Sequence, residues 1–314
     1  FQVKIFDNFK KYSYNVTMID IRDADYYKEI TFSRDSYVKK LLSWQNQHVI
    51  KVITGVRRAG KSVVLKTLCQ ELSKTVPSEQ ITFLNFEMLE NEDLLEYHAL
   101  HTALKSRLVS GKMNYILLDE IQLVNKFEKV IDSLFVSPNV DIYLTGSNAD
   151  LLSSEIATLL SGRYVELHVL PFSFSEFQTA YKSHFSEQNL DIPSIYTKFI
   201  TFGGFPYLHN IYEQNENIRD YISGLYSTIV LKDIQQRKKI SDTVLLEKVV
   251  KFALVHTGNL LSPKKISDTF VSNGRKTAPL TIENCLNALC ESFLFYKLNR
   301  YDVRGKETLK TLEK

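Results

Sequence analysis

Residues 49–65 read VIKVITGVRRAGKSVVL, and this stretch decides the fold. The run is mostly apolar and β-branched up to residue 54, as in a buried strand, and the pattern G-x-x-x-x-G-K-S then leads into an apolar helix. A glycine-rich loop in this position turns its backbone N–H groups toward phosphate oxygens, and the helix adds the positive end of its dipole. The sequence therefore predicts a nucleoside triphosphate site. We expect Lys61 to reach the β- and γ-phosphates and Ser62 to ligate Mg²⁺.

The predicted nucleotide-binding residues are the whole loop and the start of the helix. They are Gly55, Val56, Arg57, Arg58, Ala59, Gly60, Lys61, Ser62 and Val63. The segment 125–128 imitates a guanine-specificity motif but has Glu128 where that motif has aspartate. ATP is therefore favoured over GTP as the ligand.

Composition is that of an ordinary globular protein of two or three domains. The 314 residues are 44% hydrophobic and 24% charged, with a net charge of +3, which by itself does not indicate a nucleic-acid binder. Three cysteines without metal-ligand spacing agree with a reducing compartment. No signal peptide and no long apolar run is present, so we expect a cytoplasmic protein that does not enter a membrane.

A second motif, YILLDEIQ, occupies residues 115–122. Its apolar residues predict a strand buried on both faces, and two acids follow at the carboxyl end, where open α/β sheets bind ligands. We expect Asp119 to hold Mg²⁺ through its water shell and Glu120 to polarise the attacking water. An acidic pair also favours hydrolases of the additional-strand type over GTPases.

A third motif, VDIYLTGSN, occupies residues 140–148 and predicts another buried strand. In the additional-strand type this strand lies between the strand before the phosphate loop and the strand that ends in the acids. Its end then faces the γ-phosphate, so Asn148 is a candidate sensor, or Ser147 if the register differs.

Residues 161–171 predict a fifth strand, and Arg163 stands at its start. An arginine there can project into the nucleotide site of a neighbouring subunit and stabilise transition-state charge. Arg57 and Arg58 are competing candidates for this role, and an ordinary surface arginine is the alternative. Arg237 is a candidate second sensor that reaches back to the nucleotide from the helix predicted at 218–238, and a surface residue that stabilises the helix dipole is the favoured alternative.

These motifs carry a resemblance to the predicted ATPases of the AAA superfamily found in bacteria and archaea. The segments GVRRAGKS, LLDEIQ, LTGSN and SGRY, followed by LPFSFSEF, occur in the order typical of that family. The resemblance covers about residue 33 to the end and implies an ATP and Mg²⁺ site made by Lys61, Ser62, Asp119 and Glu120. It further implies Asn148 as sensor and Arg163 as finger. Family members usually continue into a further carboxyl-terminal domain, which we expect to be missing here.

The predicted fold is an α/β P-loop NTPase with a parallel five-stranded sheet flanked by helices, then a helical lid and a winged helix-turn-helix. The predicted domains are an N-terminal extension without an assigned role (1–32), the ATPase core (33–171), the lid (172–240) and the winged-helix domain (241–314). Helical spacing predicts long helices at 91–109 and 218–238 and a shorter one at 151–160.

In the last domain, helices are predicted at 245–255, from Ser262-Pro263 onward, and from a cap at Thr281. Residues 293–298 and 307–309 are predicted to pair as the wing. The basic residues of a candidate DNA-contacting surface are Lys264, Lys265, Arg275, Lys276, Arg300, Arg304 and Lys306. The third helix carries no arginine or lysine that would read guanine, so base-specific recognition is not supported. A protein-binding or self-associating module is the alternative.

The favoured function is that of an ATP-hydrolysing switch or motor that binds ATP and ADP. The sequence leaves three possible partners open, which are DNA, a protein client and other copies of the chain in a homo-oligomer. A helicase is one alternative, but the residues after the fifth strand show no second motor domain. A scaffold or DNA-binding module that holds ATP without hydrolysing it is another, and Glu120 argues against it because binding alone needs no base.

Overall fold

The computed structural model describes residues 32–147, 162–184, 191–211, 215–230, 234, 240 and 242–298. The chain forms two compact units. One comprises the described residues up to Thr54 together with Gly60–Val169, and the other comprises Gly55–Ala59 and the described residues from Leu170 onward. The predicted extension before residue 32 and the predicted helix at 151–160 lie outside the described residues.

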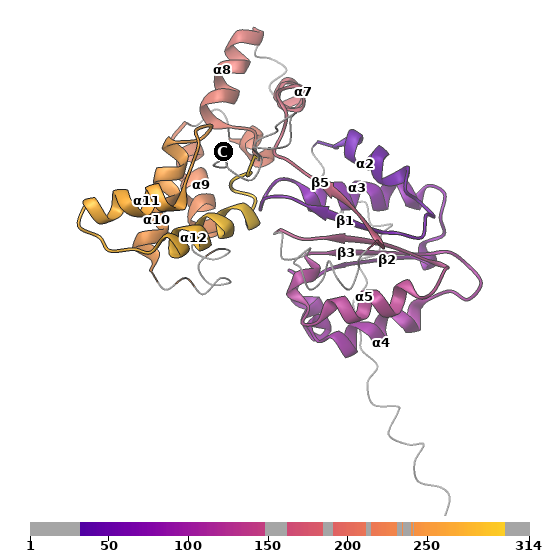
Figure 1. The fold of residues 1–314 in the computed structure, drawn as a ribbon. Helices are drawn as coiled ribbons and strands as arrows, with labels where there is room; N and C mark the ends of the chain where they lie inside the picture. The colour runs from indigo at the N-terminus through magenta and orange to yellow at the C-terminus, as the bar shows by residue number, and fades with distance from the viewer. Residues whose placement is uncertain are drawn as a thin grey trace, which may run out of the picture. The chain divides into compact units, whose positions relative to one another are not determined.

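The first unit is built on a parallel five-stranded sheet (Figure 1). Its strands are β1 (Ile50–Thr54), β2 (Ile81–Asn85), β3 (Asn114–Asp119), β4 (Val140–Thr145) and β5 (Tyr164–His168). They lie in the order β2-β3-β4-β1-β5. This order confirms the predicted fold class, including the insertion of β4 between the strand before the phosphate loop and the strand that carries the acids.

Helices cover both faces of this sheet (Figure 1). The helices α2 (Asp35–Leu42) and α3 (Lys61–Ser73) lie on one face, and α4 (Tyr97–Arg107) and α5 (Phe127–Phe135) lie on the other. A large apolar core fills the space between the sheet and α4 and α5, with Val52, Ile116 and Leu118 among its strand residues. Because side chains alternate along a strand, the neighbouring residues of these strands point toward α2 and α3.

The predicted helix at 91–109 is wrong in its first part. A short 3₁₀ helix, η2 (Leu89–Leu95), comes first, and α4 begins only at Tyr97. The side chain of Asn91 donates to the carbonyl of Asn85 at 2.8 Å, and the extended residue Glu96 pairs with Asn125. These tertiary contacts interrupt the helix that the local sequence favours. Two further 3₁₀ helices, η1 (Ser78–Gln80) and η3 (Ile121–Leu123), precede β2 and follow β3.

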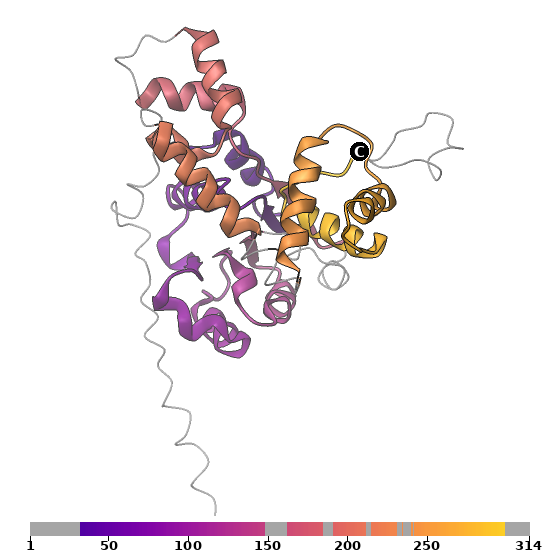
Figure 2. The ribbon, with the colours of Figure 1, turned by 90° about the vertical axis from the view of Figure 1, so that its left-hand side faces the viewer.

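The second unit is helical in its described part. Its elements are α7 (Phe174–His184), α8 (Ile192–Phe202), η5 (Pro206–Asn210), α9 (Asn215–Ser227), α10 (Thr243–Val255), α11 (Pro263–Ser272) and α12 (Pro279–Glu291). The helix α7 packs on α8 and η5, while α10 and α11 both pack on α12 (Figure 2). Side-chain caps begin three of these helices, with Asp191, Asp242 and Ser262 accepting from backbone amides three residues later. The cap at Ser262 and the proline after it were predicted.

A glycine pair joins α8 to η5. The carbonyl of Gly204 accepts from the amide of Phe172 at 2.7 Å, so the two backbones lie in direct contact. A Cβ atom at position 204 would lie 2.4 Å from the carbonyl oxygen of Phe172, closer than packed atoms allow. Gly203 has φ 83°, which also favours glycine. The segment 203–206 therefore serves packing within the second unit.

Two predictions for this unit are wrong, and a third is confirmed only in part. Within the helix predicted at 218–238, the α-helix ends at Ser227, and residues 228–230 and 234 form π-helical turns, with the Thr228 hydroxyl donating to the Gly224 carbonyl. Most of the residues after 230 in this predicted helix lie outside the described part of the chain. The helix α12 is preceded by Ala278, with Pro279 at its first position, so Thr281 is not its cap. The strand predicted at 293–298 is not formed.

The helix end explains the missing strand. Phe293 adopts φ 58°, and the amides of Leu294 and Phe295 both donate to the Leu289 carbonyl, which closes α12 in a left-handed cap. The other half of the predicted wing lies beyond residue 298, outside the part of the chain that the structure describes. The described residues therefore include helices of the last predicted domain, and no strand of the wing forms among residues 293–298.

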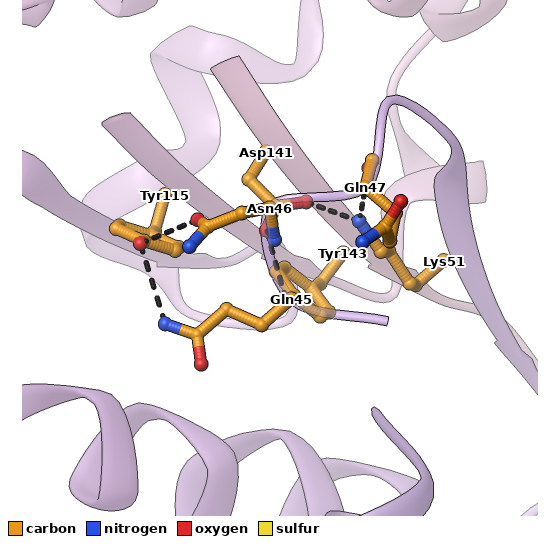
Figure 3. A network of polar contacts seen from close by, with 7 residues as sticks. All are labelled: Gln45, Asn46, Gln47, Lys51, Tyr115, Asp141 and Tyr143. Atoms are coloured by element: carbon orange, nitrogen blue, oxygen red, sulfur yellow. Dashed lines mark hydrogen bonds and ion pairs between the residues drawn. The ribbon is translucent and has the colours of Figure 1, made fainter. Parts of the chain in front are cut away.

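A buried polar network fixes the chain to the amino-terminal edge of the sheet (Figure 3). Lys51 on β1 forms an ion pair with Asp141 on β4 and donates to the carbonyl of Gln47 at 2.8 Å. Asp141 also accepts from the Asn46 amide at 2.9 Å and from the Tyr143 hydroxyl at 3.0 Å. Burial lowers the pKa of Lys51, and the hydrogen bond and charge of Asp141 oppose this effect. The ion pair thus holds the loop before β1 in place.

We predict that Lys51→Met destabilises the protein by about 3–5 kcal/mol, because it leaves the Asp141 carboxylate buried without its cation. The double variant Lys51→Met/Asp141→Asn is expected to recover part of this loss, since it buries no uncompensated charge. Urea denaturation of the two single variants and the double variant measures the coupling. If the losses of unfolding free energy in the two single variants added up to the loss in the double variant, the ion pair would not contribute to stability.

Candidate functional site

The loop between β1 and α3 bends through three residues with left-handed backbone conformations. These are Gly55 (φ 144°), Arg58 (φ 66°) and Gly60 (φ 95°). The Val56 carbonyl accepts from the Ala59 amide at 3.1 Å, which closes a turn inside the loop. Gly60 stands at the N-cap of α3 and has no side chain to bond the first-turn amides. Such amides, together with the helix dipole, form an anion site.

Asp119 ends β3 and is fully buried. Its side chain points toward the α3 face, because Ile116 and Leu118 point into the opposite core. Its Oδ1 atom accepts from the Ser62 hydroxyl at 3.1 Å and from the Thr145 hydroxyl at 2.5 Å. Its Oδ2 atom is buried and has no hydrogen-bond partner among the described residues. Burial raises the pKa of Asp119 from 3.8 to about 6.

Glu120 turns the chain out of the strand in a left-handed conformation, with φ 56° and ψ 44°. Its amide donates to the Thr145 hydroxyl oxygen at 2.9 Å, which holds this bend. Its carboxylate oxygen Oε1 lies 3.8 Å from the Lys61 ammonium, and both side chains are at most 10% exposed. Gln122 donates to the other carboxylate oxygen. The two acids therefore lie beside the lysine and serine that follow the phosphate loop.

Thr145, the last residue of β4, lies beside the two acids, and the sequence did not single it out. Thr145 bonds both the Asp119 carboxylate and the Glu120 amide. The alternation of β4 could have indicated it, since Thr145 falls on the same face as Asp141 and Tyr143. Ser147, one of the two sensor candidates, is buried, and its Oγ atom lies 3.5 Å from the Gln122 amide nitrogen. The other candidate, Asn148, lies outside the described residues.

The arrangement fits a magnesium ion. Oxygen ligands are those that Mg²⁺ prefers, and it usually binds one or two protein oxygens together with waters and phosphate. The unpartnered Asp119 Oδ2 atom and the adjacent Ser62 hydroxyl supply such oxygens. Within the described residues, no group of three or more histidine, cysteine, aspartate or glutamate side chains is placed to hold a metal alone. Bound phosphate oxygens would therefore be needed to complete the coordination.

A second polar cluster lies at the ends of β1 and β5. The Thr54 hydroxyl donates to Glu166 at 2.5 Å, and its oxygen lies 3.0 Å from His168 Nδ1. Burial lowers the pKa of His168, while the charge of Glu166 raises it and that of Lys61 lowers it. The sequence analysis missed this cluster, because its members come from two strands whose pairing it did not predict residue by residue.

Arg163 lies at the amino-terminal side of β5, opposite the strand ends that carry the acids. Its guanidinium forms an ion pair with Asp132 on α5 at 2.6 Å and lies 5.7 Å from the centre of the Phe135 ring. The pair is nearly half exposed on both sides. Arg163 therefore does not belong to the phosphate site of its own chain. Arg237 lies outside the described residues.

The basic residues proposed for DNA contact differ in their surroundings. Lys264 and Lys265 lie exposed in the first turn of α11, and Lys276 is exposed in the loop before α12. Arg275 instead donates two hydrogen bonds of 2.6 Å to Asp242, and this contact lowers the pKa of Asp242. Arg300, Arg304 and Lys306 lie outside the described residues.

Comparisons with known proteins agree with this fold. Residues 47–178 match the model of an AAA domain, and residues 194–314 match a domain of unknown function. An uncharacterised protein of Haemophilus influenzae is 40% identical over 282 residues, which cover 89% of this chain and 69% of that protein. An uncharacterised protein of Methanocaldococcus jannaschii is 30% identical over 268 residues, which cover 82% of this chain and 58% of that protein.

A solved structure, the Walker-type ATPase of Pyrococcus abyssi, shares the fold with a TM-score of 0.61 at 17% identity, over 90% of this chain and 93% of that one. The strand order, the glycine-rich loop and the paired acids define the class of P-loop nucleoside triphosphatases. Within that class, the chain belongs to the AAA-type ATPases. None of the helices in the described residues is long and apolar enough to cross a membrane.

We predict that Asp119→Asn changes the pH dependence of stability in metal-free buffer. Native Asp119 stays protonated up to pH of about 6, whereas an unfolded aspartate loses its proton near 3.8, so the native protein loses stability as the pH rises between these values. The variant does not titrate. Its free energy of unfolding, relative to wild type, should rise by up to about 3 kcal/mol from pH 4 to pH 7.

Denaturation with urea at several pH values, with a chelator present, measures this difference. Asp93→Asn, which changes an exposed aspartate of η2, is the matched control. If the free energies of unfolding of Asp119→Asn and wild type differed by the same amount at all pH values, burial would not raise the pKa of Asp119.

Proposed function

We propose that this chain binds ATP with Mg²⁺ and hydrolyses it to ADP and phosphate. The observation that carries the proposal is the convergence of Lys61 and Ser62 with Asp119 and Glu120 at one edge of the sheet. A helix start without a side-chain cap, a buried lysine, a carboxylate oxygen with no hydrogen-bond partner among the described residues and a second carboxylate supply the four requirements of phosphoryl transfer to water. Binding alone would not need the second carboxylate.

Each residue has a distinct part in the proposed reaction. Lys61 neutralises charge on the β- and γ-phosphates, and the loop amides bind their oxygens. Glu120 accepts a hydrogen bond from the attacking water and polarises it. Thr145 fixes both acids by one hydroxyl group, since it donates to Asp119 and accepts from the Glu120 amide. Ser62 and Asp119 would hold Mg²⁺, which neutralises the charge that develops on the phosphate oxygens.

Hydrolysis would serve as a switch or motor. We propose that the γ-phosphate, when present, is sensed at the end of β4, by Asn148 or Ser147, and that its loss shifts the position of later helices. We also propose a homo-oligomer in which Arg163 reaches the nucleotide of a neighbour, supported by its position on the sheet edge away from its own phosphate site. DNA contact through Lys264, Lys265 and Lys276, a protein client and a cytoplasmic location stay predictions.

We predict that Glu120→Gln keeps nucleotide affinity but lowers ATP turnover by at least about 100-fold, because glutamine cannot accept the proton of water. Phosphate release and ADP binding, each with and without duplex DNA, measure the two effects. Glu79→Gln, which changes an exposed glutamate of η1 before β2, is the matched control. Undiminished turnover in Glu120→Gln would rule out Glu120 as the base, and turnover that rises with DNA would favour a DNA-linked function.

We predict that Arg163→Ala also loses turnover at unchanged affinity if it completes a neighbour's site. Asp132→Asn removes the ion pair within the chain but keeps the cation, so it should retain turnover, and the exposed pair should add at most about 1 kcal/mol of stability. Sedimentation with and without ATP tests the oligomer. Equal turnover in wild type and Arg163→Ala would exclude catalysis through this residue.

A further inference from the structure

The Gln122 side chain contacts both Glu120 and Ser147, which follows β4. Its amide nitrogen Nε2 donates to the Oε2 atom of Glu120 and lies 3.5 Å from the Ser147 hydroxyl oxygen. The nitrogen end of the amide faces Glu120, because Nε2 is the only atom of the Gln122 side chain that can donate to a carboxylate oxygen. The carbonyl oxygen Oε1 of Gln122 is therefore the free end of the amide.

This carbonyl oxygen is buried and has no hydrogen-bond partner among the described residues. A buried acceptor without a donor is unfavourable, and native proteins keep few of them. The second such atom at this site is the Asp119 Oδ2 atom, which we assign to the metal. Two unpartnered oxygens beside Lys61 indicate that their partners arrive with the ligand, a metal ion for Asp119 and a hydrogen-bond donor for Gln122.

The backbone places Gln122 for this purpose. Glu120 bends the chain in the left-handed conformation, and η3 begins immediately after it, so the side chains of residues 120 and 122 lie against each other. The bend is unfavourable for a residue other than glycine. The hydrogen bond from the Glu120 amide to the Thr145 hydroxyl maintains this bend. The Glu120 carboxylate thereby stays between Lys61 and Gln122.

We propose that Gln122 positions the attacking water together with Glu120. This inference rests on the proposed ATP hydrolysis and adds a residue to it. The water donates one hydrogen to the Glu120 carboxylate and the other to the Gln122 carbonyl, which directs its lone pair at the γ-phosphorus. The new P–O bond forms as the bond to the β,γ-bridging oxygen breaks, and the electron pair leaves with ADP. The water proton passes to Glu120 and then to the released phosphate.

The test compares Gln122→Met with Gln70→Met. Methionine has nearly the length of glutamine but no amide, and Gln70 is an exposed residue of α3 that provides the same substitution away from the site. We expect Gln122→Met to lower kcat by roughly 10- to 100-fold, as for a misplaced nucleophile, with KM within a factor of about three. Gln70→Met should match wild type in both constants.

A second measurement separates water positioning from a structural role. ADP with aluminium fluoride forms a complex that requires a water in line with the metal fluoride. Gln122→Met should bind ADP as wild type does and lose this complex by a factor similar to its loss of kcat. Loss of ADP affinity in parallel with kcat would overturn the proposal.

The remaining outcomes distinguish this inference from the proposed function. Unchanged or raised kcat in Gln122→Met, with Glu120→Gln inactive, would overturn the role of Gln122 and leave ATP hydrolysis by Glu120 standing. A raised kcat would mean that Gln122 restrains Glu120. Absence of hydrolysis by the wild-type chain would overturn the proposed function itself, and the role of Gln122 with it.

Discussion

The structure depends on the position of β4 between β1 and β3. All strands of a parallel sheet end at the same edge, so this order places Thr145 between the phosphate-loop strand and the acids. One hydroxyl group then binds the carboxylate of Asp119 and the backbone of Glu120. If β1 paired directly with β3, the acids would lose this partner. Strand order, more than any single contact, therefore creates the site.

The sequence predicted the fold, and it singled out four residues that the structure brings together, because their signals are local. The phosphate loop and the acids each combine an apolar strand with a fixed residue pattern, and the structure brings Ser62 to Asp119 and Lys61 to Glu120. Thr145 and Gln122 were missed as site residues because their parts depend on pairing between distant segments. The long helix predicted from residue 91 was wrong for the same reason, since Asn91 is bonded to the end of β2.

Buried polar groups at the two ends of the strands differ in whether they have partners. At the amino-terminal edge, Lys51 and Asp141 satisfy each other, and nearby backbone and hydroxyl groups complete the network. At the carboxyl-terminal edge, Asp119 and Gln122 each retain a buried oxygen without a donor among the described residues. Polar groups that all have partners stabilise the fold, whereas buried groups that lack partners favour binding of a ligand that supplies them. The amino-terminal ends of the strands therefore carry a stabilising network, and the carboxyl-terminal ends carry the candidate ligand site.

The left-handed conformation of Glu120 has a consequence for engineering and selection. Glycine adopts that conformation without strain, so a library screened for thermal tolerance should accumulate glycine at this position. The same replacement deletes the carboxylate. Since Glu120 is the proposed base, laboratory evolution toward heat resistance would favour variants without the proposed turnover, unless turnover is selected at the same time.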